Sequence, residues 1–205
     1  SELQVNKLSK PMVNIWNVIK SCISCYLIEQ SYQKANFDRM KYFNKNFLHP
    51  VFQMKKDEYV EIRNIGIGSS SFVNLIYHIE EERFFALKRT KKYEINAPNL
   101  IDREKKNYPK FNSPFFPIFY GTIEKENSII IEFINGETLD NIGKLHLSKK
   151  EKYNIILQLI QSIQFLHHNH FIYRDLKPNN VMIDANKNLV LIDFDRLLNT
   201  DRITE

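Results

Sequence analysis

The first quarter of the chain spaces its apolar residues like a helix. Across 12–27, large apolar side chains recur every three or four residues, which puts them on one helix face. Pro11 precedes this stripe at a position that suits a first helical turn. A weaker stripe of the same kind covers 37–47. These patterns predict a helical extension over 1–58 that packs on the following domain; a partner-binding helix is the alternative, without specific support.

From Tyr59 onward the pattern changes to short strands. Segments rich in β-branched and aromatic residues alternate with turn-like or charged stretches. The charged stretch 99–111 predicts a helix that Pro109 ends or kinks. The apolar run at 128–134 is nearly continuous, as in a buried strand. We expect strands at 59–67, 72–79, 83–89, 118–123, 128–134, 181–183 and 189–192.

A long helix is expected over 149–167. It opens at Ser148, and Glu151 three residues later completes the pattern of a capping box. The order of elements, strands with one helix and then a long helix with a hairpin, predicts a two-lobed α+β fold. We place a β-rich lobe at 59–134 and an incomplete helical lobe at 135–205. The apolar residues expected on one face of the long helix are Tyr153, Ile156, Leu157, Ile160, Ile163 and Leu166.

Composition narrows the class of protein. The chain has 205 residues, 43% of them hydrophobic and 26% charged, which excludes a disordered tail, a collagen-like chain and a disulfide-rich miniprotein. The net charge of +5 is modest and the lysines are dispersed, so we expect no nucleic-acid partner. No apolar run reaches the roughly 18 residues of a membrane span. Cys22 and Cys25 lack a second pair for a zinc site, and they fit ordinary thiols in an intracellular, cytoplasmic protein better than a redox motif.

Glycine is scarce, and two of the five glycines stand one residue apart. Gly66 and Gly68 lie between two predicted strands, where small residues let backbone N–H groups approach a polyphosphate. Such a pair alone equally fits a plain hairpin turn. Lys88 follows Gly68 by 20 residues, the length of two strands running out and back, which brings its ammonium beneath the loop. A lysine in that place needs a carboxylate to hold it, and Glu104 is the candidate.

A group of oxygen-bearing residues lies in the second lobe. Asp175 and Asn180 belong to the string YRDLKPNN at 173–180. Asp193 opens the tripeptide Asp-Phe-Asp, 13 residues after Asn180. An acidic base, an amide ligand and a carboxylate ligand are what a Mg²⁺–polyphosphate site uses, because hard Mg²⁺ prefers oxygen ligands.

Together these motifs resemble those of the eukaryotic protein kinases, of the serine/threonine type and nearest the tyrosine-kinase-like branch. The resemblance covers 59–197 and rests on the catalytic-loop string, its offset to Asp193, the glycine pair and Lys88. Lys177, two places after Asp175, is the serine/threonine-type choice. The resemblance implies a β-rich N-lobe, a helical C-lobe, and transfer of the γ-phosphate of ATP to a protein hydroxyl with Mg²⁺ as cofactor.

The resemblance also implies a role for each site residue. Asp175 would orient the substrate hydroxyl, and Lys177 would stabilise the γ-phosphate. Lys88 would hold the α- and β-phosphates and pair with Glu104. Asn180 and Asp193 would bind Mg²⁺. The residues implied to contact the nucleotide are Gly66, Gly68, Val73, Ala86 and Met182, together with the gatekeeper Ile131 and the hinge residues Glu132 and Ile134. The positions of the family's internal hydrophobic spine fall on Tyr108, Phe119, Tyr173 and Phe194.

Two departures from the family pattern keep other interpretations open. Asp195 replaces the glycine of the Asp-Phe-Gly motif, and its Cβ and charge restrict the backbone beside a metal ligand. The chain stops at Glu205, before an activation segment, so we expect a truncated domain with weak activity on proteins. The rivals are a pseudokinase or nucleotide-binding scaffold without useful turnover, and a compact kinase that works without that segment. The uncovered apolar face of helix 149–167 predicts self-association.

Overall fold

The computed structural model describes residues 52–91, 97–123 and 125–202. The helices expected across 12–27 and 37–47, and both cysteines, lie outside these residues. All described residues belong to one compact unit of the chain. Within it, no described helix combines the length and the apolar character needed to cross a membrane.

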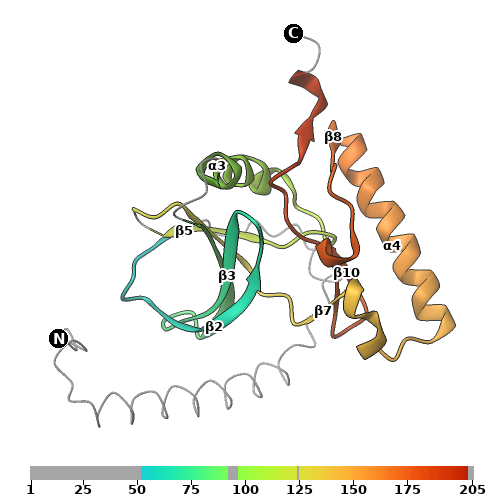
Figure 1. Cartoon of the computed structure of the whole chain (residues 1–205), viewed down its shortest axis with the longest axis horizontal. Helices are drawn as coiled ribbons and strands as arrows, with labels where there is room; N and C mark the ends of the chain where they lie inside the picture. Colours follow the sequence, from blue (N-terminus) through green and yellow to red (C-terminus); the bar gives the residue numbers. More distant parts are fainter. Residues whose placement is uncertain (1–51, 92–96, 124, 203–205) are drawn as a thin grey trace. The chain divides into compact units, whose positions relative to one another are not determined.

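A six-stranded sheet forms the first lobe (Figure 1). The strands lie in the order β1-β5-β6-β4-β3-β2, so β4 is central and its residues 85–88 are buried. Every strand predicted in this lobe is confirmed, with ends that agree to within two residues. The strands are β1 (Phe52–Met54), β2 (Tyr59–Ile67), β3 (Ser71–His78), β4 (Arg83–Thr90), β5 (Phe119–Ile123) and β6 (Ser128–Glu132).

One strand of this sheet, β1, was not expected. It comes from the stretch 52–58, which the sequence pattern assigned to the helical extension, and it runs parallel to β5 with Phe52 opposite Gly121. Met54 is fully buried in a cluster that contains residues of the other five strands. Three residues are too few to show the two-residue alternation of a strand, so the sequence carries no signal for β1.

Helix α3 (Ala97–Asn107) packs against β4 and β6. It continues as a single 3-10 turn, η2 (Tyr108–Lys110), and Pro109 within that turn supplies no N–H donor to continue an α-helix. The predicted helix is therefore confirmed, with its last turn tightened. Its fully buried positions include the apolar Ile101 and the acidic Glu104. A carboxylate buried on the sheet-facing side of a helix needs a specific partner.

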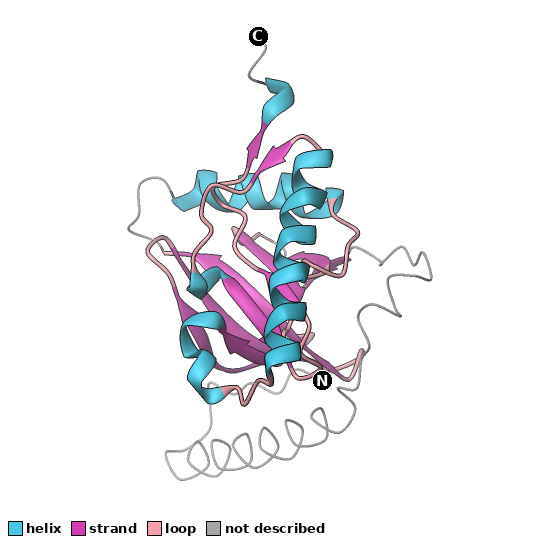
Figure 2. Cartoon of the chain, turned by 90° about the vertical axis from the view of Figure 1, so that its right-hand side faces the viewer, coloured by secondary structure: helices cyan, strands magenta, loops and turns pink. Residues whose placement is uncertain are grey.

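The second lobe contains one long helix and several short strands (Figure 2). The strands β7, β9 and β10 form one small sheet, and β8 and β11 form another. Helix α4 packs beside β8 and β10. The elements are β7 (Gly136–Thr138), η3 (Leu139–Lys144), α4 (Lys149–His168), β8 (Phe171–Ile172), η4 (Pro178–Asn180), β9 (Val181–Asp184), β10 (Leu189–Leu191), β11 (Leu198–Asn199) and η5 (Thr200–Arg202).

The predicted capping box begins helix α4. The Glu151 N–H donates to the Ser148 hydroxyl at 3.3 Å, and the Ser148 N–H donates to the Glu151 carboxylate at 2.7 Å. These two bonds satisfy donors that a helix N-terminus otherwise leaves to water. The start of the helix was therefore correctly predicted from four residues of sequence.

The single apolar face predicted for α4 is wrong, because the helix has two apolar stripes. Ile155 and Leu166 are buried in the core, and Ile163 packs against it. The remaining predicted residues are between 52% and 58% exposed. Because residues advance by about 100° along a helix, these residues lie on the opposite side. We call them the exposed stripe of α4: Tyr153, Ile156, Leu157 and Ile160.

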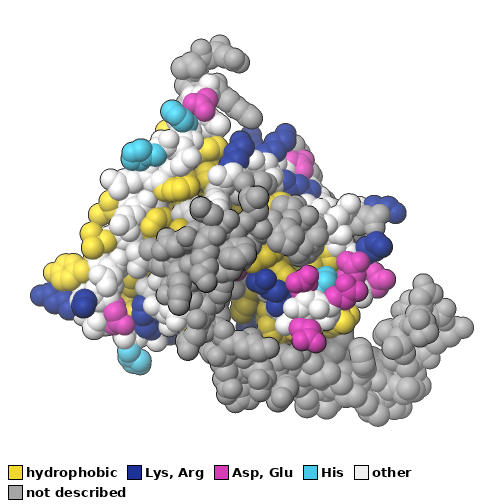
Figure 3. All heavy atoms as spheres, turned by 180° about the vertical axis from the view of Figure 1, so that it is seen from behind, with side chains coloured by type: hydrophobic (Ala, Val, Ile, Leu, Met, Phe, Trp, Pro, Cys, Tyr) yellow, Lys and Arg dark blue, Asp and Glu magenta, His cyan; other side chains and the backbone are white. Residues whose placement is uncertain are grey.

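Apolar side chains are visible at the surface on this side of the described lobe. Figure 1 places α4 on the right, and Figure 3, seen from behind, shows hydrophobic side chains along the left-hand edge. An apolar stripe of this kind on a helix is unusual for a solvated surface.

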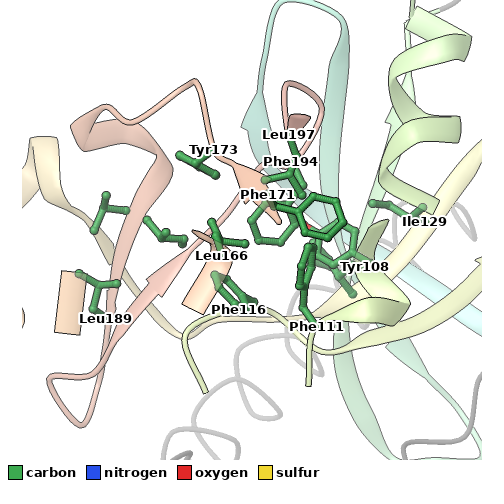
Figure 4. Packing of buried hydrophobic residues seen from close by; sticks show 14 of the residues in the cluster. Tyr108, Phe111, Phe116, Ile129, Leu166, Phe171, Tyr173, Leu189, Phe194 and Leu197 are labelled. Atoms are coloured by element: carbon green, nitrogen blue, oxygen red, sulfur yellow. The ribbon is translucent and has the colours of Figure 1, made fainter. Parts of the chain in front are cut away.

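The main hydrophobic core connects the two lobes. It contains Ile101 of α3, Ala86 of β4 and Ile131 of β6 together with residues of α4, β9 and β10. Phe194 is fully buried in it, and its ring contacts four other aromatic rings (Figure 4). These rings belong to Tyr108, Phe111, Phe116 and Tyr173, with centroids 4.8 to 6.0 Å from that of Phe194. Phe194, the residue after Asp193, is thus held in place by aromatic rings from both lobes.

Candidate active site

The glycine pair lies at the tip of the β2–β3 hairpin. The Gly68 N–H donates to the Ser71 carbonyl at 2.9 Å, which closes a tight turn. An added Cβ would meet its nearest neighbour at 3.7 Å at Gly66 and at 3.5 Å at Gly68, both ordinary contact distances. Gly121 is the only described glycine with a positive φ. Neither packing nor backbone conformation therefore requires glycine at positions 66 and 68. This favours the interpretation that a ligand approaches the bare backbone closely over that of a plain turn.

A buried ion triad lies beneath this hairpin. The Lys88 ammonium donates to Glu104 Oε1 at 2.8 Å and to Asp193 Oδ1 at 2.9 Å. Glu104 Oε1 also accepts the Phe194 N–H at 2.8 Å. The sequence predicted the first contact, and the structure adds the second, which connects β4 and α3 to the segment after β10.

Burial and charge shift the acidities of the triad in opposite directions. Burial lowers the pKa of Lys88, but the charges of Glu104 and Asp193 outweigh it and hold that pKa above its ordinary value. Burial raises the pKa of Glu104 to about 7, against the lowering effect of Lys88. Burial also acts to raise the pKa of Asp193, but the Lys88 charge and hydrogen bond keep it below the ordinary value. One ammonium thus serves two carboxylates, and Glu104 Oε2 is buried without a hydrogen-bond partner among the described residues.

The catalytic-loop residues form a second polar group between β8 and β9. Asp175 Oδ2 accepts the Lys177 ammonium at 2.8 Å and the Asn180 side-chain amide at 2.8 Å. Asn180 Nδ2 also donates to the Asp175 carbonyl at 3.0 Å. These contacts fix the Asp175 carboxylate, while its neighbour Lys177 remains half-exposed. The structure thus brings together the three residues that the string YRDLKPNN predicts to act together.

Two residues at the site adopt a left-handed backbone. Arg174 has a φ of 62° and Asp193 a φ of 68°. Such conformations of non-glycine residues cost of the order of 1–3 kcal/mol and concentrate at functional sites. Arg174 Nε donates to the Arg196 carbonyl at 2.8 Å, which ties the catalytic loop to the residues after Asp193.

The residues implied to contact adenine lie mostly on one face of the sheet. Ala86 is opposite Ile131 in register, and Val73 is opposite Lys88, so strand alternation gives these side chains the same face as the Lys88 ammonium. Met182 belongs to the second lobe, on β9, and is half-buried. Glu132 ends β6, Gly136 begins β7, and Ile134 lies in the short segment between them.

The first residue of β7, Gly136, is a structural residue that the sequence reasoning missed. At Gly136 an added Cβ would fall 2.8 Å from the Cα of Asp184, and closer still to the carbonyl oxygen of Ile183. Only glycine therefore allows β7 to pair with β9 at this point. Because glycine is scarce in this chain, each glycine is expected to have a local structural role. This was the signal by which sequence reasoning could have found Gly136.

Four aromatic residues stack through the site as the family spine predicts. The Tyr108 ring lies 6.2 Å from that of Phe119 and 4.8 Å from that of Phe194, which in turn lies 6.0 Å from that of Tyr173. The Tyr173 hydroxyl donates to the carbonyl of Ile192, the residue before Asp193. The spine therefore positions Asp193 from both sides, through ring packing and through one hydrogen bond.

Asp195 adds a third carboxylate next to the triad. Its Oδ1 is buried and has no hydrogen-bond partner among the described residues. Burial and the neighbouring charge of Asp193 raise the pKa of Asp195 above its ordinary value. A buried carboxylate oxygen without a partner is unfavourable, and Asp195 contributes one such oxygen to the site although the residue as a whole is half-buried.

With this geometry in place, comparison with known families identifies the fold. The sequence model of the protein kinase domain matches residues 59–201, which is most of the described chain. The chain therefore belongs to the protein kinase family. The predicted α+β fold, with a β-rich first lobe, is confirmed by this match.

Curated relatives give the kind of kinase. Serine/threonine-protein kinase SIK2 of Gallus gallus is 32% identical over 138 residues, covering 64% of this chain and 17% of the relative. Dual specificity protein kinase zakA of Dictyostelium discoideum is 33% identical over 153 residues, covering 68% and 19%. The cAMP-dependent protein kinase catalytic subunit of Schizosaccharomyces pombe is 24% identical over 180 residues, covering 82% and 35%. The chain thus matches a serine/threonine-type kinase domain and spans between 17% and 35% of these relatives' lengths.

Proposed function

We propose that the chain binds ATP with Mg²⁺ and transfers the γ-phosphate to a serine or threonine hydroxyl of a protein. The observation that carries this proposal is the contact of the buried Lys88 ammonium with both the buried Glu104 and the partly exposed Asp193. A structural ion pair needs one carboxylate for one ammonium. A second carboxylate in the same site, next to the catalytic loop, suits a site that receives a further cation together with phosphates.

The donor atoms fit Mg²⁺, which prefers oxygen ligands. Asn180 directs its amide nitrogen to Asp175, so its amide oxygen is the donor that we assign to the metal. Asp193 holds Lys88 through Oδ1, and we assign its carboxylate as the second ligand. When bound, Mg²⁺ neutralises charge on the phosphates and makes the γ-phosphorus easier to attack.

The protein's own groups position the reactants. The Lys88 ammonium is held by its two carboxylates at a place where it binds the α- and β-phosphates beneath the glycine hairpin. A substrate hydroxyl donates to Asp175, and its oxygen attacks the γ-phosphorus while the bond to the β–γ bridging oxygen breaks. Asp175 receives the hydroxyl proton. Lys177, 2.8 Å from Asp175, stabilises the charge on the transferred phosphoryl group.

A second candidate function rests on Asp195. A half-buried carboxylate with one unpartnered buried oxygen, two residues after the proposed metal ligand Asp193, favours a pseudokinase, a module that binds nucleotide without useful turnover. The two functions share the nucleotide site and differ only in phosphoryl transfer.

Transfer of radiolabelled phosphate from ATP to a generic basic protein separates the two. For a kinase we expect measurable transfer that falls about a hundredfold or more in Asp175→Asn, because a general base contributes at least that factor. Asp57→Asn, in the exposed turn after β1, is the matched control and should leave transfer unchanged. Asp195→Gly should keep or increase transfer. Mg²⁺-dependent ATP binding without any transfer, in the parent protein and in Asp195→Gly alike, would instead establish the pseudokinase.

The intracellular, cytoplasmic location expected from the sequence stays a prediction.

A further inference from the structure

The glycine hairpin is braced at its root by a side chain outside the site. Asn64 Nδ2 donates to the carbonyls of Gly66 and Val73, at 3.3 and 3.1 Å, and to Asn74 Oδ1 at 3.0 Å. The β2–β3 register shifts between Asn64 and Gly66, so this amide satisfies carbonyls at an irregular point of the ladder. The root of the hairpin is therefore fixed by strand pairing and by Asn64.

The tip of the hairpin has no comparable packing. Ile67, its only large apolar side chain, is 76% exposed. The turn residues Ser69 and Ser70 are small, Ser69 is exposed and Ser70 is half-buried. Hydrogen bonds rather than apolar burial must therefore hold the tip in one position.

Lys91 supplies two such bonds from the end of β4. Its ammonium donates to the Gly68 carbonyl at 2.6 Å, and its backbone N–H donates to the Ser70 carbonyl at 2.9 Å. One residue thus holds both sides of the turn. It follows Lys88 by three positions, so the strand that carries the triad lysine also holds the loop above it.

The geometry separates the role of Lys91 from that of Lys88. Lys91 is the residue directly after β4, and its ammonium donates to the Gly68 carbonyl, whereas the Lys88 ammonium donates to Glu104 and Asp193. The two lysines therefore hold different parts of the site, Lys91 the turn and Lys88 the triad. Both hydrogen bonds of Lys91 go to the backbone of the turn, so Lys91 can order the loop without belonging to the triad.

We propose that Lys91 is a positioning residue for the nucleotide, which fixes the tip of the glycine hairpin over the phosphates. This inference rests on the proposed function, since it assumes that the hairpin covers a nucleotide. A charge-assisted bond to a backbone carbonyl is short and strong compared with a neutral one. A loop that is ordered before the ligand arrives loses less conformational freedom on binding, and affinity rises accordingly.

The test compares Lys91→Met with Lys91→Arg in the full chain. Methionine keeps the stem without a donor, and arginine restores a donor that reaches the Gly68 carbonyl. Lys150→Met, an exposed lysine of α4, is the control. Hydrogen exchange of the amides at 66–71 is measured without nucleotide, and affinity for a non-hydrolysable ATP analogue with Mg²⁺ is measured by calorimetry.

We expect Lys91→Met to speed exchange at 66–71 several-fold and to weaken the analogue about tenfold. Arginine should restore both values, and Lys150→Met should change neither. In transfer assays the loss should appear in KM, with kcat little changed. Unchanged exchange in Lys91→Met overturns the brace, whatever the affinity does. Faster exchange with unchanged affinity keeps the brace but overturns its role for the nucleotide. A parent protein that binds no analogue, yet shows the exchange effect, rejects the proposed function and with it the nucleotide role.

Discussion

Replacing Lys88 by methionine tests the buried triad at the centre of the site. Methionine keeps much of the stem but removes the ammonium that lies 2.8 Å from Glu104 and 2.9 Å from Asp193. The Glu104 side chain is 0% exposed, so its carboxylate cannot regain water in the folded state. Removing one partner of a buried ion pair costs about 3–5 kcal/mol of unfolding free energy. We expect a loss within that range at pH 8.

The pH dependence of this loss follows from Glu104. Its pKa in the folded protein, about 7, lies above the ordinary value of 4.5. The folded state therefore binds more protons than the unfolded state in this window, and the Glu104 contribution makes stability fall as pH rises through it. Without the Lys88 ammonium, the pKa of Glu104 rises further. Each unit of that rise corresponds to about 1.4 kcal/mol of free energy. The loss in Lys88→Met should thus be about 1.5 kcal/mol smaller at pH 5 than at pH 8.

Urea unfolding followed by circular dichroism at pH 5 and pH 8 measures both quantities. The double variant Lys88→Met/Glu104→Gln is the control, because it removes the unpaired carboxylate together with the ammonium. It should lose most of the additional pH dependence. An equal loss at both pH values in Lys88→Met, or a loss below 1 kcal/mol at pH 8, would refute the reasoning about a charged buried triad.

Three further predictions concern the surrounding structure. Gly136→Ala should lower the unfolding free energy by about 1–3 kcal/mol, because the new Cβ meets the Ile183 carbonyl. Chemical denaturation measures this change, and an unchanged midpoint would contradict the close approach of β7 to β9 at Gly136. Tyr173→Phe should cost about 1–3 kcal/mol, because the carbonyl of the partly buried Ile192 loses its donor, and Mg²⁺-dependent nucleotide affinity should fall with it. Wild-type values of both would rule out a positioning role for the hydroxyl. Leu157→Glu on the exposed stripe of α4 should abolish concentration-dependent association in sedimentation experiments; a parent chain that is monomeric at all concentrations would show that this stripe mediates no self-association.

The sequence predicts those parts of the fold that leave a long periodic signal. The strands from β2 to β6 were placed to within two residues, and α4 was placed from its capping box and apolar spacing. The short strands β1 and β8 leave no period to read, whereas the equally short β10 was predicted from its apolar run. The two stripes of α4 were merged because apolar spacing does not tell which stripe meets the core.

The site was predicted where chemistry restricts the residue type. The contact between Lys88 and Glu104 followed from spacing and charge, and the contact of Lys88 with Asp193 follows only from the folded chain. Lys91 could not be predicted, because a lysine at the end of a strand is ordinarily solvated and its partner is a backbone carbonyl. Backbone partners carry no sequence signal, which is why bracing residues of this kind emerge only from the structure.

Calorimetric titration of ATP into the 205-residue chain, with and without Mg²⁺, tests the central claim most directly. The account predicts binding that depends on Mg²⁺ and weakens at least about tenfold in Asp193→Asn, because that variant removes a charged metal ligand but keeps its shape. Circular dichroism verifies that both proteins are folded. ATP binding that is equally strong without Mg²⁺, or unchanged in Asp193→Asn, would contradict the account.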